Sequence, residues 1–381
     1  MLRAMIYAML LELGLALGQA QSAAINPIKE FSTEQGGILS GTFSAPDQIV
    51  VETQDIASST PPDGRPVSPG RHLSIYDLTE VAWTHAVPIE SGSEPNGCSK
   101  IVFVKESNSL VMCEGDRTIR IRDAPTLKAK QVFATTRGVS LDDLAVSESQ
   151  DVVYTVGVNQ NGTLIIGSYS LTSGILLKET NASEGFRYPS ASLAIADGGQ
   201  YLAIAVEDPG NRKMRGAIIV CNTNDQPMTC RSVPLKEFVA QAAFLYDNSL
   251  LFVSSVLATA HSSECVQRLQ LATFTIETQA FCSKDGPAHY ALALLGHDRV
   301  VAYTGYARRN SFTENTTTVS NDISVWSVEP KRVVFVAADS VKPGALQNEV
   351  RIVPDHGDEN RFMMFRRFAG TVSVFRLPSV R

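Results

Sequence analysis

Two adjacent pairs of residues join a proton donor to an aromatic ring: Arg187 with Tyr188, and His289 with Tyr290. A guanidinium or imidazole group can polarise a carbonyl oxygen or assist the departure of a hydroxyl group, and tyrosine offers flat apolar contact with a polar tip. The pattern predicts a site for an organic ligand that is uncharged or weakly acidic and partly aromatic. We assign catalytic roles to His289, Tyr290 and Arg187. The expected substrate-binding residues are Tyr188, Asn96, Phe238, Gln241 and Asn348.

Sequence motifs for metal or cofactor chemistry are missing from the chain. It contains no P-loop, GxGxxG, GxSxG or HExxH sequence, and its six histidines do not have metal-ligand spacing. We therefore expect no cofactor and no metal. The acidic run 355–360 is interpreted as a solvated polar turn. Asp142 and Asp143 begin an expected strand, where adjacent side chains point to opposite faces, so they are not expected to act as a catalytic pair.

The charge balance argues against nucleic-acid binding. Lysine and arginine number 33 against 39 acidic residues, a formal net charge of −6, so no basic excess is present to neutralise phosphates. Hydrophobic residues make up 44% of the 381 residues and charged residues 19%, which excludes an intrinsically disordered chain. The expected partner is a small-molecule substrate, with a protein partner on the loop face as the alternative.

The N-terminus has the pattern of a secretory leader. Arg3 supplies a positive charge, residues 4–17 are mostly apolar, and residues 18–20 place small side chains at a cleavage site. The apolar run is shorter than the roughly 20 residues that a membrane span needs. We predict a signal peptide over 1–20 and a mature chain, 21–381, that lies in the secretory pathway or outside the cell and does not bind a membrane. An N-terminal amphipathic helix or membrane anchor is the alternative.

Two further features agree with secretion. Three Asn-X-Ser/Thr sequons begin at Asn161, Asn181 and Asn315, and each is predicted to be a glycosylated surface position. The six cysteines are even in number and include no CxxC pair, which favours disulfides over a zinc site. Their short spacings favour three local pairs: Cys98 with Cys113, Cys221 with Cys230, and Cys265 with Cys282. The third pair does not fall opposite in the expected strand register.

The elements that position these residues follow from a repeat. A period-two strand ends seven times just before a turn, near residues 77, 123, 171, 222, 276, 328 and 376, at intervals of 46 to 54 residues. Two earlier apolar runs and one later strand accompany each copy. A repeat of four strands with this period predicts an all-β, seven-bladed β-propeller of four-stranded blades. A β-sandwich or two small barrels would not confine the intervals so narrowly, and the period-two strands exclude a helical solenoid.

The ends of the chain predict how the ring closes. Blades are expected to end near 90, 135, 180, 235, 284 and 337, and the last, 345–377, lacks a fourth strand. The N-terminal segment 27–31 resembles the expected fourth strand 234–238 almost residue for residue. We predict that residues 25–33 complete the last blade and remove the open edge.

This architecture groups the candidate residues. In a propeller the connections between blades and the turns between the second and third strands gather on one face around the axis. The candidate donors and rings precede or open the first strand of their blades, which places them on that face. The alternative is that these residues only cap the pore.

The chain resembles the WD40/YVTN-like seven-bladed superfamily over its whole mature length, although no Trp-Asp dipeptide occurs and Gly296-His297 does not recur. Within it, the leader, the length, the sevenfold repeat and the missing catalytic motifs are similar to the fungal hetero-Diels–Alderases of tropolone-sesquiterpenoid biosynthesis. That resemblance implies loss of water from a hydroxymethyl tropolone to give a quinone methide, followed by cycloaddition with a humulene-type alkene. It assigns no catalytic residue.

Two other functions remain open from the sequence. One is a non-catalytic secreted propeller that binds a ligand or a protein. The other is a lactonase or cycloisomerase of the muconate-lactonising type, which would need histidine, arginine and glutamate side chains converging on the axis.

Overall fold

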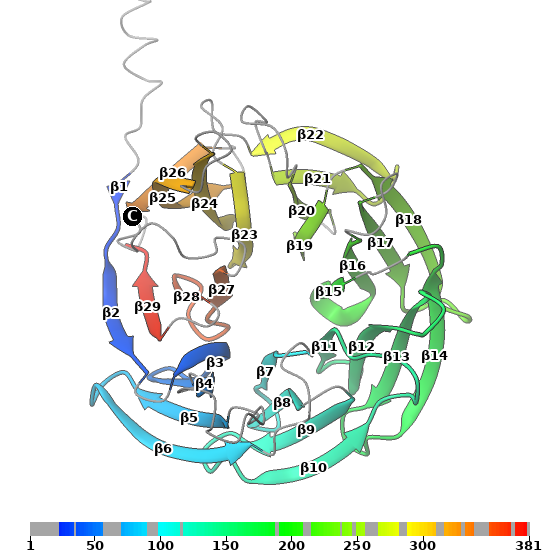
Figure 1. Ribbon diagram of the computed structural model, residues 1–381, viewed down its shortest axis with the longest axis horizontal. Coiled ribbons are helices and arrows are strands. Elements are labelled where there is room, and N and C mark those ends of the chain that lie inside the picture. Colours follow the sequence, from blue (N-terminus) through cyan, green and yellow to red (C-terminus); the bar gives the residue numbers. More distant parts are fainter. Residues whose placement is uncertain are drawn as a thin grey trace, which may run out of the picture.

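The computed structural model describes most of the chain. The described residues are 23–33, 36–55, 70–89, 98–114, 117–186, 190–208, 215–236, 238–245, 249–255, 266–281, 288–309, 316–328, 332–338, 350–366 and 370–378. They form seven sheets arranged in a ring (Figure 1). The predicted all-β, seven-bladed propeller is therefore confirmed.

Six blades take their strands from consecutive segments, with the first strand nearest the axis. The strands of blades 1 to 3 are β3 (Gly37–Ala45), β4 (Gln48–Gln54), β5 (Arg71–Asp77), β6 (Ala82–Ile89), β7 (Ile101–Val104), β8 (Ser109–Glu114), β9 (Thr118–Asp123), β10 (Ala129–Ala134), β11 (Asp143–Ser147), β12 (Val152–Val158), β13 (Leu164–Ser170) and β14 (Leu176–Ser183). Those of blades 4 to 6 are β15 (Ser190–Ile195), β16 (Tyr201–Glu207), β17 (Gly216–Asn222), β18 (Thr229–Leu235), β19 (Phe238–Phe244), β20 (Leu250–Ser255), β21 (Val266–Gln270), β22 (Thr275–Phe281), β23 (Ala288–Leu295), β24 (Arg299–Arg309), β25 (Thr316–Ser327) and β26 (Arg332–Ala338). Blade 7 comprises β27 (Val350–Pro354), β28 (Arg361–Arg366), β29 (Thr371–Arg376) and β2 (Pro27–Ser32), and a short strand β1 (Ala23–Ala24) precedes β2.

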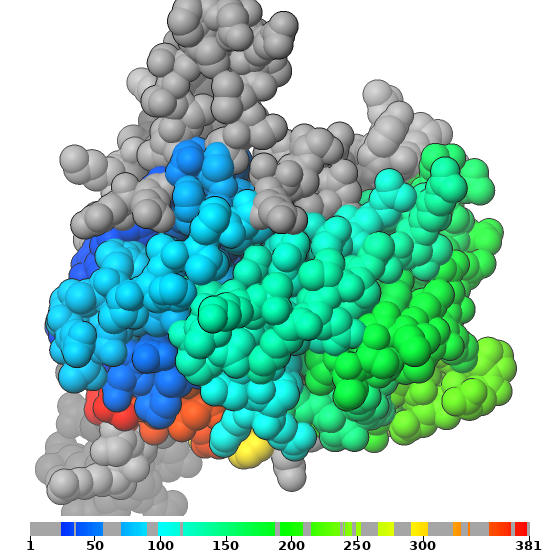
Figure 2. All heavy atoms as spheres, turned by 90° about the horizontal axis from the view of Figure 1, so that it is seen from below, coloured from blue at the N-terminus to red at the C-terminus, as the bar shows by residue number. Residues whose placement is uncertain are grey.

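The two middle strands of a blade are apolar on both faces because a neighbouring blade covers each face. In β8 all six residues are buried. Its residues Leu110 and Met112 pack toward blade 1, whereas Val111 and Cys113 pack toward blade 3. The outermost strands, such as β10, alternate between exposed and half-buried residues, which is the pattern of a strand with one solvated face. Figure 2 shows blades 1 to 3 in unbroken contact along the rim.

The ring closes through the N-terminal strand, as predicted. β2 pairs antiparallel with β29, so that Phe31 lies opposite Val372. The Phe31 ring stacks on Tyr76 of blade 1, with ring centroids 3.7 Å apart, and the two rings meet the edge of Trp83. This cluster fastens the last blade to the first.

One feature of the closure was not expected from the sequence. β1 pairs in parallel with β26, so blade 6 has five strands rather than four. Ile25, between β1 and β2, is 5% exposed and packs in a cluster with residues of blades 6 and 7. The N-terminal segment therefore joins two blades.

Two of the predicted disulfides are present. Cys221 and Cys230 lie directly opposite each other in β17 and β18. Cys98, three residues before β7, is bonded to Cys113 in β8. Cys265 and Cys282 lie outside the described residues.

Candidate functional site

The innermost strands are tied to one another by side chains at equivalent positions. Ser40 Oγ accepts a hydrogen bond from the Ile101 N–H of the next blade (3.1 Å), and Gln241 Oε1 accepts one from the Leu292 N–H (3.0 Å). Asp143 Oδ2 makes the same bond with the Leu193 N–H (2.7 Å). In each case a residue near the start of one inner strand satisfies a backbone donor on the strand beside it.

At one of these positions the inner strands are linked by an ion pair. Lys100 lies in blade 2, where its neighbours have serine, aspartate or glutamine, and a lysine cannot accept the corresponding bond from Leu144. The Leu144 N–H donates instead to Asp143 Oδ1 of its own chain segment (2.8 Å). The Lys100 ammonium reaches both carboxylate oxygens of Asp143 and the Leu193 carbonyl, each at 3.1 Å. One lysine thereby links blades 2, 3 and 4.

A second carboxyl group lies beside this tie. Asp142 Oδ1 accepts a hydrogen bond from Ser140 Oγ (2.7 Å), and the backbone N–H of Ala191 faces the same carboxyl group and acts to lower its pKa. Asp142 precedes β11, and its carboxyl group faces Ala191 of β15, whereas the Asp143 carboxylate accepts a hydrogen bond from Leu193 of the same strand. The sequence pattern predicts a strand that begins with both residues, whereas the strand begins at Asp143, so the alternation argument does not apply to this pair. We call Lys100, Ser140, Asp142 and Asp143 the axial cluster.

The two carboxyl groups have different electrostatic surroundings. Burial, together with the nearby charge of Asp143, raises the pKa of Asp142 from 3.8 to about 6, although the Ser140 hydroxyl and the Ala191 N–H act to lower it. Asp142 Oδ2 is buried and has no hydrogen-bond partner among the residues that the structure describes. Asp143 is instead compensated by Lys100 and two backbone donors. Near neutral pH, Asp142 can therefore accept or donate a proton or a hydrogen bond.

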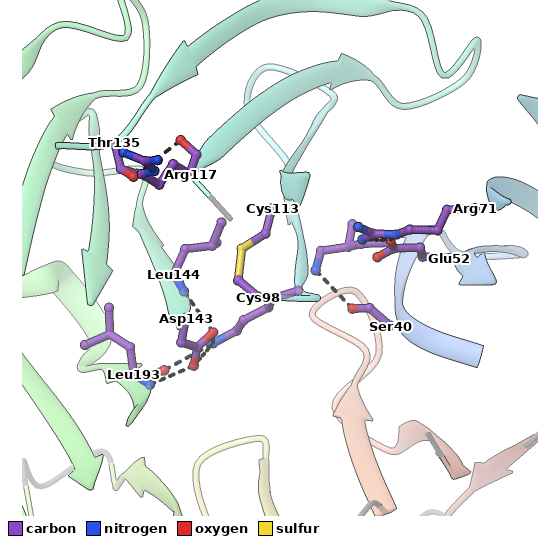
Figure 3. Close-up of a disulfide and its surroundings, with 12 residues drawn as sticks. Ser40, Glu52, Arg71, Cys98, Cys113, Arg117, Thr135, Asp143, Leu144 and Leu193 are labelled. Atoms are coloured by element: carbon purple, nitrogen blue, oxygen red, sulfur yellow. Dashed lines mark hydrogen bonds and ion pairs between the residues drawn. A yellow bond between two sulfur atoms is a disulfide. The ribbon is translucent and has the colours of Figure 1, made fainter. Parts of the chain in front are cut away.

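The axial cluster lies on the face that the sequence assigned to function. Asp143 is the first residue of β11, opposite Val156 near the end of β12, so the cluster is at the end of blade 3 where the β12–β13 turn lies. Figure 3 shows the Asp143 carboxylate pointing toward Leu193, with the Cys98–Cys113 disulfide beside it and the Glu52–Arg71 pair farther along the same side. Arg71 donates to Glu52 in an interior ion pair, with the glutamate side chain fully buried.

The structure locates some of the sequence-predicted site residues. Gln241 is half-buried, and its side-chain oxygen is used in the tie to Leu292. The backbones of His289 and Tyr290 lie in β23, and that of Phe238 lies in β19, the neighbouring inner strand. The remaining predicted site residues, Arg187, Tyr188, Asn96 and Asn348, lie outside the described residues.

Sequence reasoning did not select Lys100, Ser140 or the ionisation of Asp142. An alignment of the seven inner strands provides the missing signal. The residues at the equivalent position of these inner strands are Ser40, Lys100, Asp143 and Gln241. A lysine at this position in blade 2, followed by an aspartate at the same position in blade 3, indicates a salt bridge between the two blades.

Other predicted features are located as follows. Asn161 and Asn181 are exposed, in the β12–β13 turn and in β14, and Asn315 lies outside the described residues. In the acidic turn, Asp355 pairs with Arg361 and Asp358 with Arg376, so both carboxylates have cationic partners, and His356 is exposed. Among the described residues, no three His, Cys, Asp or Glu side chains are grouped as metal ligands. No helix in the same part of the chain is long and apolar enough to cross a membrane.

Comparison with known proteins identifies the fold alone. No known protein family and no curated protein matches the sequence. Among solved structures, Raptor from Chaetomium thermophilum is similar over 95% of this chain, with a TM-score of 0.65 and 14% identity, and the match spans 30% of Raptor. A chain of the mitotic checkpoint complex is similar over 94% of both chains, with a TM-score of 0.61 and 9% identity. The protein thus belongs to the structural class of seven-bladed β-propellers.

Proposed function

We propose that this protein is a secreted propeller that binds a small organic ligand over the axial cluster, with the Asp142 carboxyl as the main polar contact. The observation that carries the proposal is the buried Asp142 Oδ2, which has no partner in the described part of the chain. A buried acceptor without a partner costs about 1–3 kcal/mol, and a ligand hydroxyl or ammonium group would recover that cost. Neighbouring acceptors are already occupied by backbone donors and Lys100.

Secretion is the second part of this proposal. Two disulfides within the described chain are typical of proteins from oxidising compartments. We expect the exported protein to begin near Gln21 and to contain no free thiol at Cys98, Cys113, Cys221 or Cys230. Intact mass and peptide mapping of exported protein measure both, and an intact leader or reduced cysteines would contradict this localisation.

The binding function is tested with a panel of phenols, tropolones, lactones and amines, measured by thermal shift and calorimetry. We expect at least one class to bind, and Asp142→Asn to weaken that binding at least tenfold, about 1.4 kcal/mol. His356→Ala, an exposed position in the β27–β28 turn, is the matched control and should have no effect. Equal affinity in parent and Asp142→Asn would refute the assignment of Asp142, and binding of only a protein would favour the partner hypothesis.

A second candidate function is the dehydrative cycloaddition that the family resemblance implies. It is favoured by the pKa of Asp142, which at about 6 suits a general acid near neutral pH. A protonated Asp142 would donate its proton to the departing hydroxyl, which leaves as water, and the ring hydroxyl would return a proton to the carboxylate as the quinone methide forms. Holding both reactants together would lower the barrier by up to about 7–11 kcal/mol.

This reaction is tested by incubating the protein with a hydroxymethyl tropolone and a humulene-type alkene. The product mass should equal the sum of both reactants minus one water. Replacing His289 or Arg187 with alanine should slow turnover at least about tenfold, whereas His356→Ala should not. If His356→Ala abolishes turnover and the other two variants have no effect, the active face is the opposite one. No product above the uncatalysed rate would exclude this function.

A further inference from the structure

The disulfide Cys98–Cys113 lies where the inner strand of blade 2 lacks support. β7 has four residues, the fewest of the inner strands described, and its pairing with β8 begins at Ile101. The segment 98–100 extends beyond that ladder. It is held to β8 by the disulfide and by one hydrogen bond, from the Cys113 N–H to the Lys100 carbonyl (3.1 Å).

The same cysteine also contacts the segment that carries the acidic residues. The Cys98 N–H donates to the Leu141 carbonyl (3.0 Å), one residue before Asp142. Cys98 is 3% exposed and Cys113 is fully buried, and both pack with Leu141 and Leu144 in one apolar cluster. Figure 3 shows the disulfide between the Glu52–Arg71 pair and the Asp143 carboxylate. The sulfurs are therefore inaccessible to solvent and lie next to the axial cluster.

We propose that the Cys98–Cys113 disulfide is a positioning element of the axial cluster, which fixes residues 98–100 so that Lys100 bridges Asp143 of blade 3 and Leu193 of blade 4. A lysine side chain on a freely moving segment would lose rotamer and backbone entropy each time it formed three contacts. The covalent link removes that cost for the segment. The proposal rests on the axial cluster as the binding site, but the positioning itself does not depend on a ligand.

The charges facing Lys100 make the effect measurable. Asp142 and Asp143 approach from blade 3, and the contacts from blade 4 are the backbone groups of Ala191 and Leu193. If the segment is released, Lys100 no longer compensates the Asp143 carboxylate, and the uncompensated negative charge raises the pKa of the neighbouring Asp142 further. The Leu144 and Leu193 N–H groups lose their fixed acceptor and exchange faster with solvent.

The test removes each disulfide in turn without a ligand. Two double variants, Cys98→Ala/Cys113→Val and Cys98→Val/Cys113→Ala, fill the space of the sulfurs in different ways. If one of them does not fold, the other still provides the test. Cys221→Ala/Cys230→Ala is the matched control, because that disulfide joins the outer strands of blade 4. The measurements are amide exchange at residues 141–144 and 190–193, and the pH profile of the difference in unfolding free energy between each background and the same background carrying Asp142→Asn.

We expect the Cys98/Cys113 variants to exchange at least tenfold faster at these two segments and to show an upward shift in the Asp142 pH profile. Lys100→Met should reproduce the upward shift with the disulfide intact, and the control pair should change neither measurement. If a folded Cys98/Cys113 variant keeps the parental exchange and pH profile, or if the control pair shifts both equally, the proposal is wrong. If the parent protein binds no ligand, the proposed binding function is refuted, but the result of this test is unaffected.

Discussion

At the scale of single residues, the pair Asp142 and Asp143 shows how neighbouring groups of one chemistry acquire different properties. Asp143 receives two backbone donors and an ammonium group, whereas Asp142 receives neutral donors on one side only. Their difference arises from which groups of blades 2 and 4 reach them. Asp142 has fewer partners than Asp143 and is therefore the carboxyl group that is suited to bind a ligand.

The first prediction concerns the pH dependence of stability. Burial raises the folded-state pKa of Asp142 to about 6, above its usual value of 3.8, so the folded state holds this proton more tightly than the unfolded chain. The resulting stabilisation is complete below pH 3.8 and is lost as the pH rises through 6. Asp142→Asn should therefore match the parent near pH 4 and be more stable by about 2–3 kcal/mol at pH 8. Denaturant unfolding across this range measures the difference; a variant less stable than the parent at pH 8 would contradict it.

A second prediction concerns Asp143. Asp143→Ala leaves the N–H groups of Leu144 and Leu193 without their acceptor and the Lys100 ammonium without its carboxylate partner, which should cost about 2–4 kcal/mol. Asp143→Asn retains one acceptor oxygen and should cost less than the alanine variant. Urea unfolding compares the two, and equal losses would show that the hydrogen bonds do not account for the cost.

At the scale of elements, features that depend on a short stretch of chain can be predicted from the sequence. Contacts that depend on how the blades are arranged around the axis cannot. Strands such as β9 show the period-two pattern, and Cys221 and Cys230 flank a hairpin turn, so each can be predicted from a short window. The axial cluster and its partner Leu193 join residues of blades 2, 3 and 4 that lie 43 and 50 positions apart along the chain. Finding it requires knowing which residues of separate repeats meet at the axis, which no local pattern contains.

A third prediction concerns the blade 4 hairpin. The Cys221–Cys230 disulfide spans nine positions, and loop entropy limits its stabilisation to about 2–3 kcal/mol. Cys221→Ala/Cys230→Ala should lower the free energy of unfolding by no more than this amount, with an unchanged fold by circular dichroism. A larger loss would mean that the sulfurs contribute packing beyond chain entropy.

At the scale of the whole molecule, the ring depends on its first and last segments meeting. Phe31 is 7% exposed and packs among residues of blades 1 and 7, whereas Ile25 packs with blades 6 and 7. The ring is therefore closed at two successive points, by β2 and by the segment that precedes it. The sequence predicted the first point from the likeness of 27–31 to 234–238, and the two-residue strand β1 was too short to predict.

The fourth prediction separates these two points. Deleting residues 21–33 removes β2 and opens two sheet edges, so we expect aggregation and loss of soluble monomer. Deleting only 21–24 removes β1 and should leave a soluble, less stable monomer. Phe31→Ala should cost about 3–5 kcal/mol by creating a cavity beside Tyr76. Size-exclusion chromatography and thermal unfolding distinguish the three, and a fully stable 21–33 deletion would refute the closure.

The pairing of β2 with β29 also sets an order of events during synthesis. The partner of Pro27 is Phe375, so β2 is synthesised well before the strand with which it pairs. At about 5–20 residues per second, the early segment stays unpaired for tens of seconds. Blades 1 to 6 can form their four-stranded sheets in sequence during that interval. The seventh sheet cannot form until β29 has been made, so the edge of β2 lacks its partner throughout that interval.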